Sequence, residues 1–412
     1  MTSLSHITVL DLSRILAGPW CSQLLADLGA TVLKIEHPVR GDDTRSWGPP
    51  FLNDLAGNET REAAYYLGVN RNKQSVAVDF TQAEGREILI ALARDADVML
   101  ENYKVGGLAK YGLDYEAVRR VNPDIVYCSV TGFGQDGPYA KSAGYDFMIQ
   151  GMGGLMSITG ERDDLPGGGP QKVGVAVADI MTGLYATIGI QSALIHRDRT
   201  GEGQHVDLAL LDTQVAMIAN LNMNYLLSGK VPGRMGNAHA NIVPYQAFPC
   251  ADGHIILAVG NDNQFEKFCR IAKHPELSAD PRFRSNSDRV RNRDDLVPML
   301  TEIIKGRSMR DWIAACDAAQ VPCGPINRLD QVFADPQVVH RAMRIDMPHP
   351  LSGSVPQVVN PIKLSKTPLE FHSAPPLLGQ HTAQVLAQRL GYDEARIAAL
   401  AERGVIAVNP GA

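Results

Sequence analysis

The first 130 residues of the chain alternate between short β-branched runs and helix-like runs, and this alternation constrains the fold more than any other feature. We predict strands at residues 7–12, 31–36, 75–79, 98–101 and 125–130, and helices at residues 21–28, 82–94 and 115–120. A strand that continues through a helix into a second strand forms a parallel pair with a right-handed connection. The repeated unit therefore predicts an α/β fold, with helices on both faces of a mostly parallel, doubly wound sheet.

The rest of the chain is less regular. Residues 37–71 are polar and are predicted to be loop-like, and residues 228–244 contain the Gly and Pro of a linker. A different unit is predicted after this linker, with strands near Ala247 and at residues 255–259 and with helices from Gln264, Asp294 and Met309. A final helix is predicted from Thr382.

Composition excludes one class of partner. The chain has 412 residues, of which 45% are hydrophobic and 20% charged, as in ordinary globular proteins. Its net charge of −6 argues against a nucleic-acid partner, because general nucleic-acid binders carry a strong basic excess. Arg and Asp alternate between residues 280 and 294, which predicts a solvated, salt-bridged face.

The cysteines and the termini predict the compartment. The six cysteines form no CxxC pair and no zinc-like spacing, so we expect buried thiols in a reducing environment and no metal site. The N-terminus lacks the basic and apolar regions of a signal peptide. No apolar run has the length and borders of a membrane span. We therefore expect a cytoplasmic protein with no membrane partner.

One carboxylate stands alone in an apolar, helix-like run. Between residues 172 and 197 the only acidic side chain is that of Asp179. Asp is a good N-cap, so one interpretation is that Asp179 only starts this helix. The other is a reactive group, because an ionised carboxylate avoids apolar surroundings unless something compensates. These residues alone leave both interpretations open.

Two glycine clusters could be read as phosphate loops. Gly132, Gly134 and Gly137 match G-x-G-x-x-G, but Pro138 follows at once and the motif comes after the fifth strand, so a tight loop is favoured over a nicotinamide site. Residues 165–170 lack the Lys and helix of a phosphate loop and are predicted to be a surface loop.

Basic residues lie in the early loops, where phosphates could bind. Arg71 and Lys73 precede one predicted strand, whereas Lys104 and Lys110 follow another. Ligands of open α/β sheets bind at the carboxyl ends of the strands. Each of these side chains could hold a phosphate, or could simply be a solubilising surface charge.

Strings along nearly the whole chain resemble the class III coenzyme A transferases, the CaiB/BaiF family. They lie at residues 9–12, 17–19, 28–36, 41–45, 70–75, 96–102, 122–123, 129–134, 144–146, 178–180, 200–207 and 322–325. The resemblance implies a Rossmann-like large domain formed by both chain ends, a smaller α+β domain and an interlocked homodimer. It places the large domain at residues 1–227 and 331–412, and the small domain with its linkers at residues 228–330.

The resemblance also implies the chemistry. Asp179 would be the catalytic carboxylate, which takes the acyl group as an aspartyl anhydride and then the CoA as an aspartyl-CoA thioester. CoA contacts are implied at Leu16, Ala17, His37, Val78, Asn102, Tyr103, Lys104, Lys110 and Tyr145, and Arg71 and Lys73 join them as candidate phosphate ligands. No permanently bound cofactor is implied, because the coenzyme A thioester is a substrate.

Two departures from related patterns bear on the substrate. Residues 236–241 are not the glycine run of formyl-CoA:oxalate members, and the chain looks more like members that act on succinyl-CoA and other dicarboxylates. The α-methylacyl-CoA racemases share this fold but use a His where this chain has Tyr145. A tyrosine side chain has an ordinary pKa near ~10, which suits proton abstraction at neutral pH poorly. We therefore expect a transferase that moves CoA between an acyl-CoA and a small carboxylic acid, with a racemase as the alternative. An acyl-CoA-binding scaffold would not need an isolated Asp179.

Overall fold

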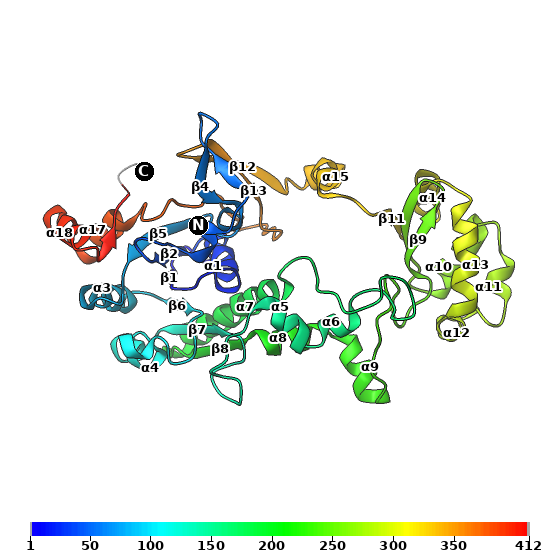
Figure 1. Cartoon of the computed structure of the whole chain (residues 1–412), viewed down its shortest axis with the longest axis horizontal. Coiled ribbons are helices and arrows are strands. Elements are labelled where there is room, and N and C mark those ends of the chain that lie inside the picture. The colour runs from blue at the N-terminus through cyan, green and yellow to red at the C-terminus, as the bar shows by residue number, and fades with distance from the viewer. Residues whose placement is uncertain (1, 410–412) are drawn as a thin grey trace. The chain divides into compact units, whose positions relative to one another are not determined.

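The computed structural model of this chain describes residues 2–409, which fold into two compact units (Figure 1). Unit 1 contains the described residues up to Gly154, Val173–Met223 and the residues from Val339 onward. Unit 2 contains Leu155–Lys172 and Asn224–Val338. The chain leaves unit 1 twice and returns each time, so both of its ends contribute to the same unit.

Unit 1 is built on a seven-stranded sheet with the order β14-β5-β2-β1-β6-β7-β8. Its parallel strands are β1 (Thr8–Asp11), β2 (Thr31–Glu36), β5 (Lys73–Val78), β6 (Val98–Glu101), β7 (Val126–Thr131) and β8 (His205–Ala209). The edge strand β14 (Ile406–Ala407) runs antiparallel beside β5. The predicted α/β class with a mostly parallel sheet is confirmed.

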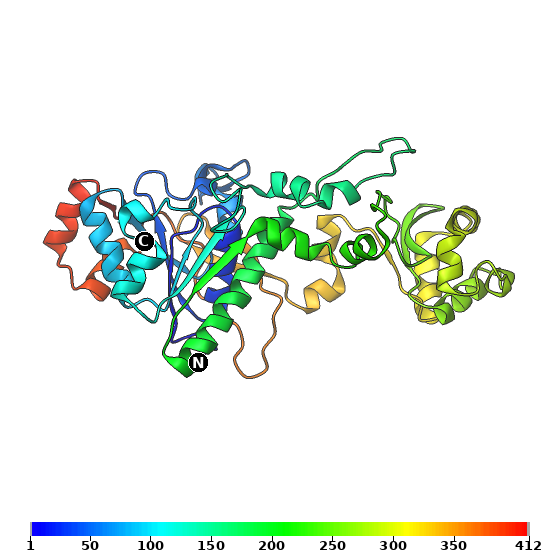
Figure 2. The same ribbon diagram turned by 90° about the horizontal axis from the view of Figure 1, so that it is seen from below.

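Helices cover both faces of this sheet, because successive strand residues point to opposite sides. On one face Val9 packs with Cys21 and Ile190, and on the other Leu10 packs with Leu89. The first face carries α1 (Ala17–Asp27) and α7 (Val177–Thr200), and the second carries α3 (Ala83–Arg94), α4 (Tyr115–Val121), α17 (Thr382–Leu390) and α18 (Glu394–Glu402). Figure 2 shows the long green helix α7 running beside the sheet. The predicted helix from Thr382 is present, but α18 and β14 follow it, so it is not the last element.

Helix α7 packs closely on α1. A Cβ on Gly183 would lie 2.7 Å from the carbonyl oxygen of Ala17, a distance that atoms do not tolerate. The missing side chain at Gly183 therefore lets the start of α1 approach α7 one turn after Asp179. The helix ends at Gly201, whose left-handed backbone is a common way for a helix to stop.

Residues 37–71 are not the plain loop that their polar composition predicts. They contain the 3-10 helix η1 (Asp43–Ser46), a hairpin of β3 (Phe51–Asn53) and β4 (Glu59–Ala63), and the short α2 (Ala64–Leu67). The buried Arg45 organises this stretch, with ion pairs to Glu36 at 2.8 Å and to Glu62 at 3.1 Å. These contacts join residues distant in sequence, and local patterns do not show them.

Unit 2 has its own core around a three-stranded sheet of order β11-β10-β9. Its elements are α6 (Leu155–Ile158), β9 (Tyr245–Cys250), β10 (Gly253–Ala258), α10 (Asp262–Ile271), α11 (Glu276–Ala279), α12 (Asn286–Arg291), α13 (Arg293–Lys305), α14 (Met309–Ala318), β11 (Cys323–Pro325) and α15 (Leu329–Ala334). The predicted salt-bridged face is seen at Arg282 and Arg291, each paired with a nearby Asp. Arg289 is an exception, because its side chain is buried and donates to the carbonyl oxygen of Val243.

The remaining elements are short and lie in unit 1 or where the chain passes between the units. They are η2 (Ala109–Tyr111), α5 (Asp146–Met152), α8 (Leu210–Met217), α9 (Asn220–Ser228), α16 (Pro336–His340), β12 (Arg344–His349) and β13 (Gly353–Val358). The last two strands pair as an antiparallel hairpin. The predicted surface loop at residues 165–170 has no helix or strand and is largely exposed.

Candidate active site

A cavity of about 490 Å³ opens in unit 1 at the carboxyl ends of the parallel strands. Residues that follow β1, β2, β5, β6 and β7 line it, together with Asp179 from α7. The sheet order explains its position. Strands β2 and β5 lie on one side of β1, and the later strands β6, β7 and β8 lie on the other. Ligands of open α/β sheets bind where the order reverses in this way.

Asp179 lines this cavity from the first turn of α7. Ala176 precedes this helix, and its side chain forms no capping hydrogen bond. The backbone N–H of Ala178 instead donates to the Asp146 carboxylate at 2.8 Å. The helix start is thus satisfied by a different acid, so the interpretation of Asp179 as the N-cap is wrong.

The surroundings of Asp179 make its carboxyl unusually basic. Burial, followed by the negative charge of Asp146, raises the pKa of Asp179 to about 7. Within residues 2–409, no donor forms a hydrogen bond to this carboxylate that would offset these effects. Asp179 is therefore present both as acid and as carboxylate near neutral pH, and a more basic carboxylate is a stronger nucleophile than an ordinary one.

The structure gathers most of the predicted CoA residues around this cavity. Its walls include Leu16, Ala17, His37, Val78, Asn102, Tyr103, Lys104, Lys110 and Tyr145. They come from the end of β5, from the segments that follow β1, β2 and β6, and from the turn before α5. Residues that are far apart in the sequence therefore share one cavity with Asp179.

Arg71 and Lys73 lie elsewhere. Both side chains are buried, and Arg71 forms an ion pair of 2.5 Å with Asp27. Lys73 donates to the carbonyl oxygen of Pro19 and to the amide oxygen of Asn70, each at 2.9 Å. Because Lys73 begins β5, it is at the amino end of that strand, whereas the cavity is at the carboxyl end. Neither residue lines the cavity.

The first glycine cluster forms a tight loop in the cavity wall. A Cβ on Gly132 would lie 2.6 Å from the backbone of Gly144, so the two chain segments touch because neither carries a side chain. No helix begins within residues 132–137, and the next one, α5, starts at Asp146. The prediction of a tight loop rather than a nicotinamide motif is confirmed.

Sequence reasoning missed several residues of the site. Arg14 lines the cavity and forms an ion pair with Asp43 at 2.8 Å, and its guanidinium lies 5.1 Å from the ring centre of Tyr103. The position of Arg14 just after a predicted strand was the signal that could have found it. Asp146 lies in one of the strings that carry the resemblance, but its effect on Asp179 depends on two segments that meet only in the fold.

Residues 4–382 match the family described as CoA-transferase family III. The chain belongs to this family. The predicted resemblance to class III CoA-transferases is confirmed, and the family members are enzymes that use CoA thioesters.

Named relatives of this CoA-transferase match over nearly their whole length. A succinate–glutarate CoA-transferase of Agrobacterium fabrum is 52% identical, and the match covers 93% of this chain and 95% of the relative. A succinyl-CoA:mesaconate CoA-transferase of Haloarcula hispanica is 37% identical, over 94% of this chain and 96% of the relative. The crystal structure of a CaiB/BaiF family protein from Brucella suis superposes with a TM-score of 0.82 at 52% identity, and covers 94% of this chain and 99% of that one.

Helix α7 also has the length and hydropathy of a membrane span, and it is the one such helix within residues 2–409. Several of its residues, among them Ala186 and Ile190, are buried in the core of unit 1. Core helices of globular proteins often have this composition, so a single helix of this kind is not enough to indicate a membrane protein.

Proposed function

We propose that this CoA-transferase moves CoA from succinyl-CoA, or a similar dicarboxylyl-CoA, to a free carboxylic acid through Asp179. The observation that carries the proposal is the setting of Asp179. It is a partly buried, unusually basic carboxylate in the cavity where the sheet order reverses. A desolvated carboxylate is a better nucleophile than one in water, and a partly desolvated cavity protects anhydrides from hydrolysis.

The proposed reaction has two symmetrical halves. The Asp179 carboxylate attacks the thioester carbonyl, the C–S bond breaks, and CoA leaves as the thiolate from an aspartyl anhydride. The thiolate attacks the aspartyl carbonyl, which gives an aspartyl-CoA thioester and releases the donor acid. The acceptor carboxylate then attacks the carbonyl of this thioester, the C–S bond breaks, and CoA again leaves as the thiolate while a second anhydride forms. The thiolate finally attacks the acceptor's acyl carbon, so the new acyl-CoA leaves and the Asp179 carboxylate is restored.

The residues around the cavity support this assignment. Lys104, Lys110 and His37 bring nitrogen donors that can pair with the phosphates of CoA. Leu16 and Ala17 stand at the start of α1, where unpaired backbone N–H groups favour negative charge. We propose that these residues, with Val78, Asn102, Tyr103 and Tyr145, hold CoA. We leave Arg71 and Lys73 out of this set, because their charges are used in other contacts.

The dicarboxylic substrate class is supported by the relatives. Those from A. fabrum and H. hispanica are named for succinate with glutarate and for succinyl-CoA with mesaconate, and all three acids are dicarboxylic. The racemase alternative is not favoured, because the named relatives are transferases. Tyr145 also stands where a racemase would need a group that titrates near neutral pH.

Several finer features belong to the same proposal. We propose a Rossmann-like large domain at residues 1–227 and 331–412, a small domain at residues 228–330, and a cytoplasmic, interlocked homodimer. Exposed apolar side chains on α7, such as Ile188 and Ile195, support a partner on unit 1. Sedimentation should show a dimer that does not dissociate on dilution without unfolding, and a folded monomer would count against the assembly.

A matrix of CoA donors against carboxylic acids, read by mass, tests the function. Succinyl-CoA with dicarboxylic acceptors should give the highest rates. Asp179→Asn should reduce transfer at least ~1000-fold, or about 4 kcal/mol of barrier, with little change in CoA affinity. Asp212→Asn, which removes an exposed acid at the start of α8, is the matched control.

Hydroxylamine provides a second, independent readout. Added to the wild type with acyl-CoA, it should convert the acylated Asp179 to a hydroxamate that peptide mapping can locate. A fully active Asp179→Asn variant, or a hydroxamate only at another acid, would refute Asp179 as the nucleophile.

A further inference from the structure

The turn between β1 and α1, residues 13–16, has a strained backbone. Ile15 adopts a φ of 72°, in the left-handed region that β-branched residues avoid. Arg14, Ile15 and Leu16 line the cavity together with Asp179. Strain of this kind persists only where the surrounding structure enforces it, and at the wall of a reactive cavity it points to a functional constraint.

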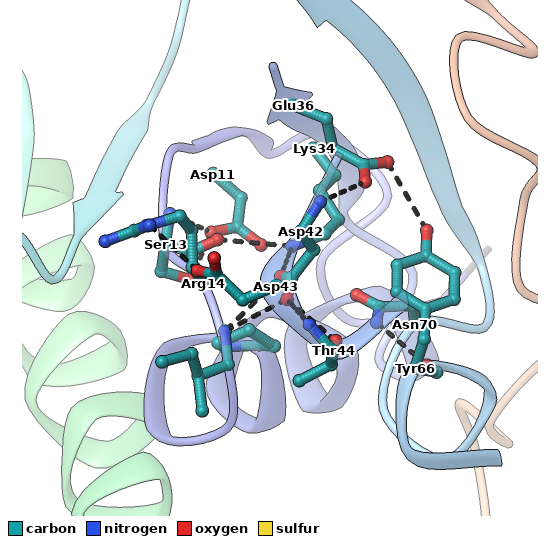
Figure 3. A network of polar contacts seen from close by, with 12 residues as sticks. Asp11, Ser13, Arg14, Lys34, Glu36, Asp42, Asp43, Thr44, Tyr66 and Asn70 are labelled. Atoms are coloured by element: carbon teal, nitrogen blue, oxygen red, sulfur yellow. Dashed lines mark hydrogen bonds and ion pairs between the residues drawn. The ribbon is translucent and has the colours of Figure 1, made fainter. Parts of the chain in front are cut away.

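Two oppositely charged side chains, Lys34 and Asp42, hold this turn (Figure 3). The Lys34 ammonium, from β2, donates to the carbonyl oxygen of Ser13 at 3.1 Å. Both carboxylate oxygens of Asp42 accept from the backbone N–H of Ile15, each at 3.3 Å. The strained residue and the residue two positions before it are therefore both tied to one pair of side chains.

Lys34 and Asp42 form an ion pair of 2.8 Å in which both side chains are fully buried. Burial alone would raise the pKa of Asp42, but the charge of Lys34 and hydrogen bonds from Thr44 hold it at about 2. The neighbouring acids raise the pKa of Lys34 despite its burial. Both groups are thus charged at any physiological pH. Apolar residues of similar volume often give the same stability as a buried pair, so stability alone explains this one poorly.

Arg14, between Ser13 and Ile15, is tied to the residue that follows β6. The amide oxygen of Asn102 accepts from the backbone N–H of Arg14 at 2.9 Å, and the Asn102 amide nitrogen donates to the Arg14 carbonyl at 2.7 Å. Ser13, Arg14 and Ile15 are therefore each held by a side chain. The turn leads directly into α1, whose first residue packs against α7 one turn after Asp179.

We propose that Lys34 and Asp42 are positioning residues, which force the turn at residues 13–16 into its strained shape and so set the distance between the start of α1 and Asp179. Asp42 is part of the cavity wall, whereas Lys34 is not; both side chains are fully buried, and neither is given a chemical step. The kinetic part of this inference rests on the proposed function. Its structural part, the holding of the turn, does not.

The first experiment separates positioning from stability. The double variant Lys34→Met/Asp42→Leu replaces the pair with apolar side chains of similar size. We expect its thermal midpoint to stay within about 4 °C of the wild type. Its kcat/KM for transfer from succinyl-CoA should fall at least ~100-fold, because a shift of about 1 Å in the position of a substrate relative to the reactive group can cost this much. The control Arg197→Met/Asp97→Asn removes an ion pair at the amino ends of the strands and should keep wild-type kcat/KM.

A second experiment remains informative if that double variant does not fold. Asp42→Asn keeps an acceptor for Ile15 but removes the charge, and it should lose kcat/KM. Glycine occupies the left-handed region without strain, so adding Ile15→Gly should restore at least ~10-fold of the loss. If Ile15→Gly gives no gain in kcat/KM in the Asp42→Asn background, the proposal is overturned. A Lys34→Met/Asp42→Leu enzyme with wild-type kcat/KM would also overturn it.

Amide hydrogen exchange separates failure of this inference from failure of the proposed function. Peptides that cover residues 12–18 should exchange faster in Lys34→Met/Asp42→Leu than in the wild type, whatever reaction the enzyme catalyses. If Asp179→Asn stays active but this exchange increases, the proposed function fails and the holding role stands. Unchanged exchange in the turn refutes the holding role even if Asp179 is the nucleophile.

Discussion

Replacing Asp179 by Asn should make the protein more stable at neutral and alkaline pH, but not in acid. The reason is the pKa of Asp179, which burial and then the charge of Asp146 raise from the usual 3.8 to about 7. Asn has nearly the same shape as Asp but carries no charge that must be buried. The variant therefore removes the cost of ionising this side chain in the folded protein.

The sign follows from the two pKa values. As pH rises from the unfolded value toward the folded one, the unfolded chain loses the Asp179 proton first, so the wild type becomes less stable. The Asn variant has no such proton. The full difference between the two pKa values corresponds to ~4 kcal/mol. Because the side chain keeps some contact with solvent, we expect a gain of roughly 2–4 kcal/mol for the variant above pH ~7, and none near pH ~4.

Thermal or urea unfolding of the two proteins across this pH range measures the effect. The gap between their free energies of unfolding should widen as pH increases and then level off. Asp212→Asn serves as the control for removing an acid that is exposed. A gap between Asp179→Asn and the wild type that stays constant across the pH range would refute the argument that burial makes Asp179 basic.

Three further outcomes are expected. Asp146→Asn should lower the pKa of Asp179, because it removes a neighbouring negative charge. The Asn amide oxygen can still accept from the α7 backbone, so the helix start is kept. The acid limb of the pH–kcat/KM profile should therefore move to lower pH. Gly183→Ala should cost about 1–3 kcal/mol of unfolding free energy, measured by urea titration, because its methyl would meet the Ala17 carbonyl at 2.7 Å; wild-type stability would contradict the close packing. With Tyr145 unchanged, a 2-methylacyl-CoA in deuterated water should gain no α-deuterium at a catalytic rate by mass spectrometry, and rapid exchange that depends on Asp179 would revive the racemase alternative.

The elements that local pattern predicted well are those whose signals lie within one segment. The strands β2 and β6 have the predicted ends, and α3 begins one residue after the predicted start. Their β-branched or amphipathic runs are bounded by clear turn residues. The stretch at residues 37–71 failed for the opposite reason, because Arg45 organises it through partners on other elements, among them Glu36 on β2 and the carbonyl oxygen of Pro376.

The candidate site divides in the same way. A resemblance spread along the chain was enough to predict the family, and the nine CoA contacts that it implied line one cavity together with Asp179. The basic side chains before one predicted strand added Arg71 and Lys73 as candidate phosphate ligands. Only the fold could show that these two charges are buried in other contacts, because sequence gives the charge of a side chain but not its partner.

By itself, the sequence determined the α/β class, the alternation that builds the sheet and the isolation of one acid in an apolar helix. These are properties of single segments, fixed by side-chain periodicity and by turn residues. The tertiary structure decided what that acid can do. Asp146 reaches Asp179 because the first turns of α5 and α7 meet, and the buried pair of Lys34 and Asp42 holds a strained turn in the cavity wall. Electrostatic effects and strain depend on distances between segments, and those distances exist only once the chain has folded.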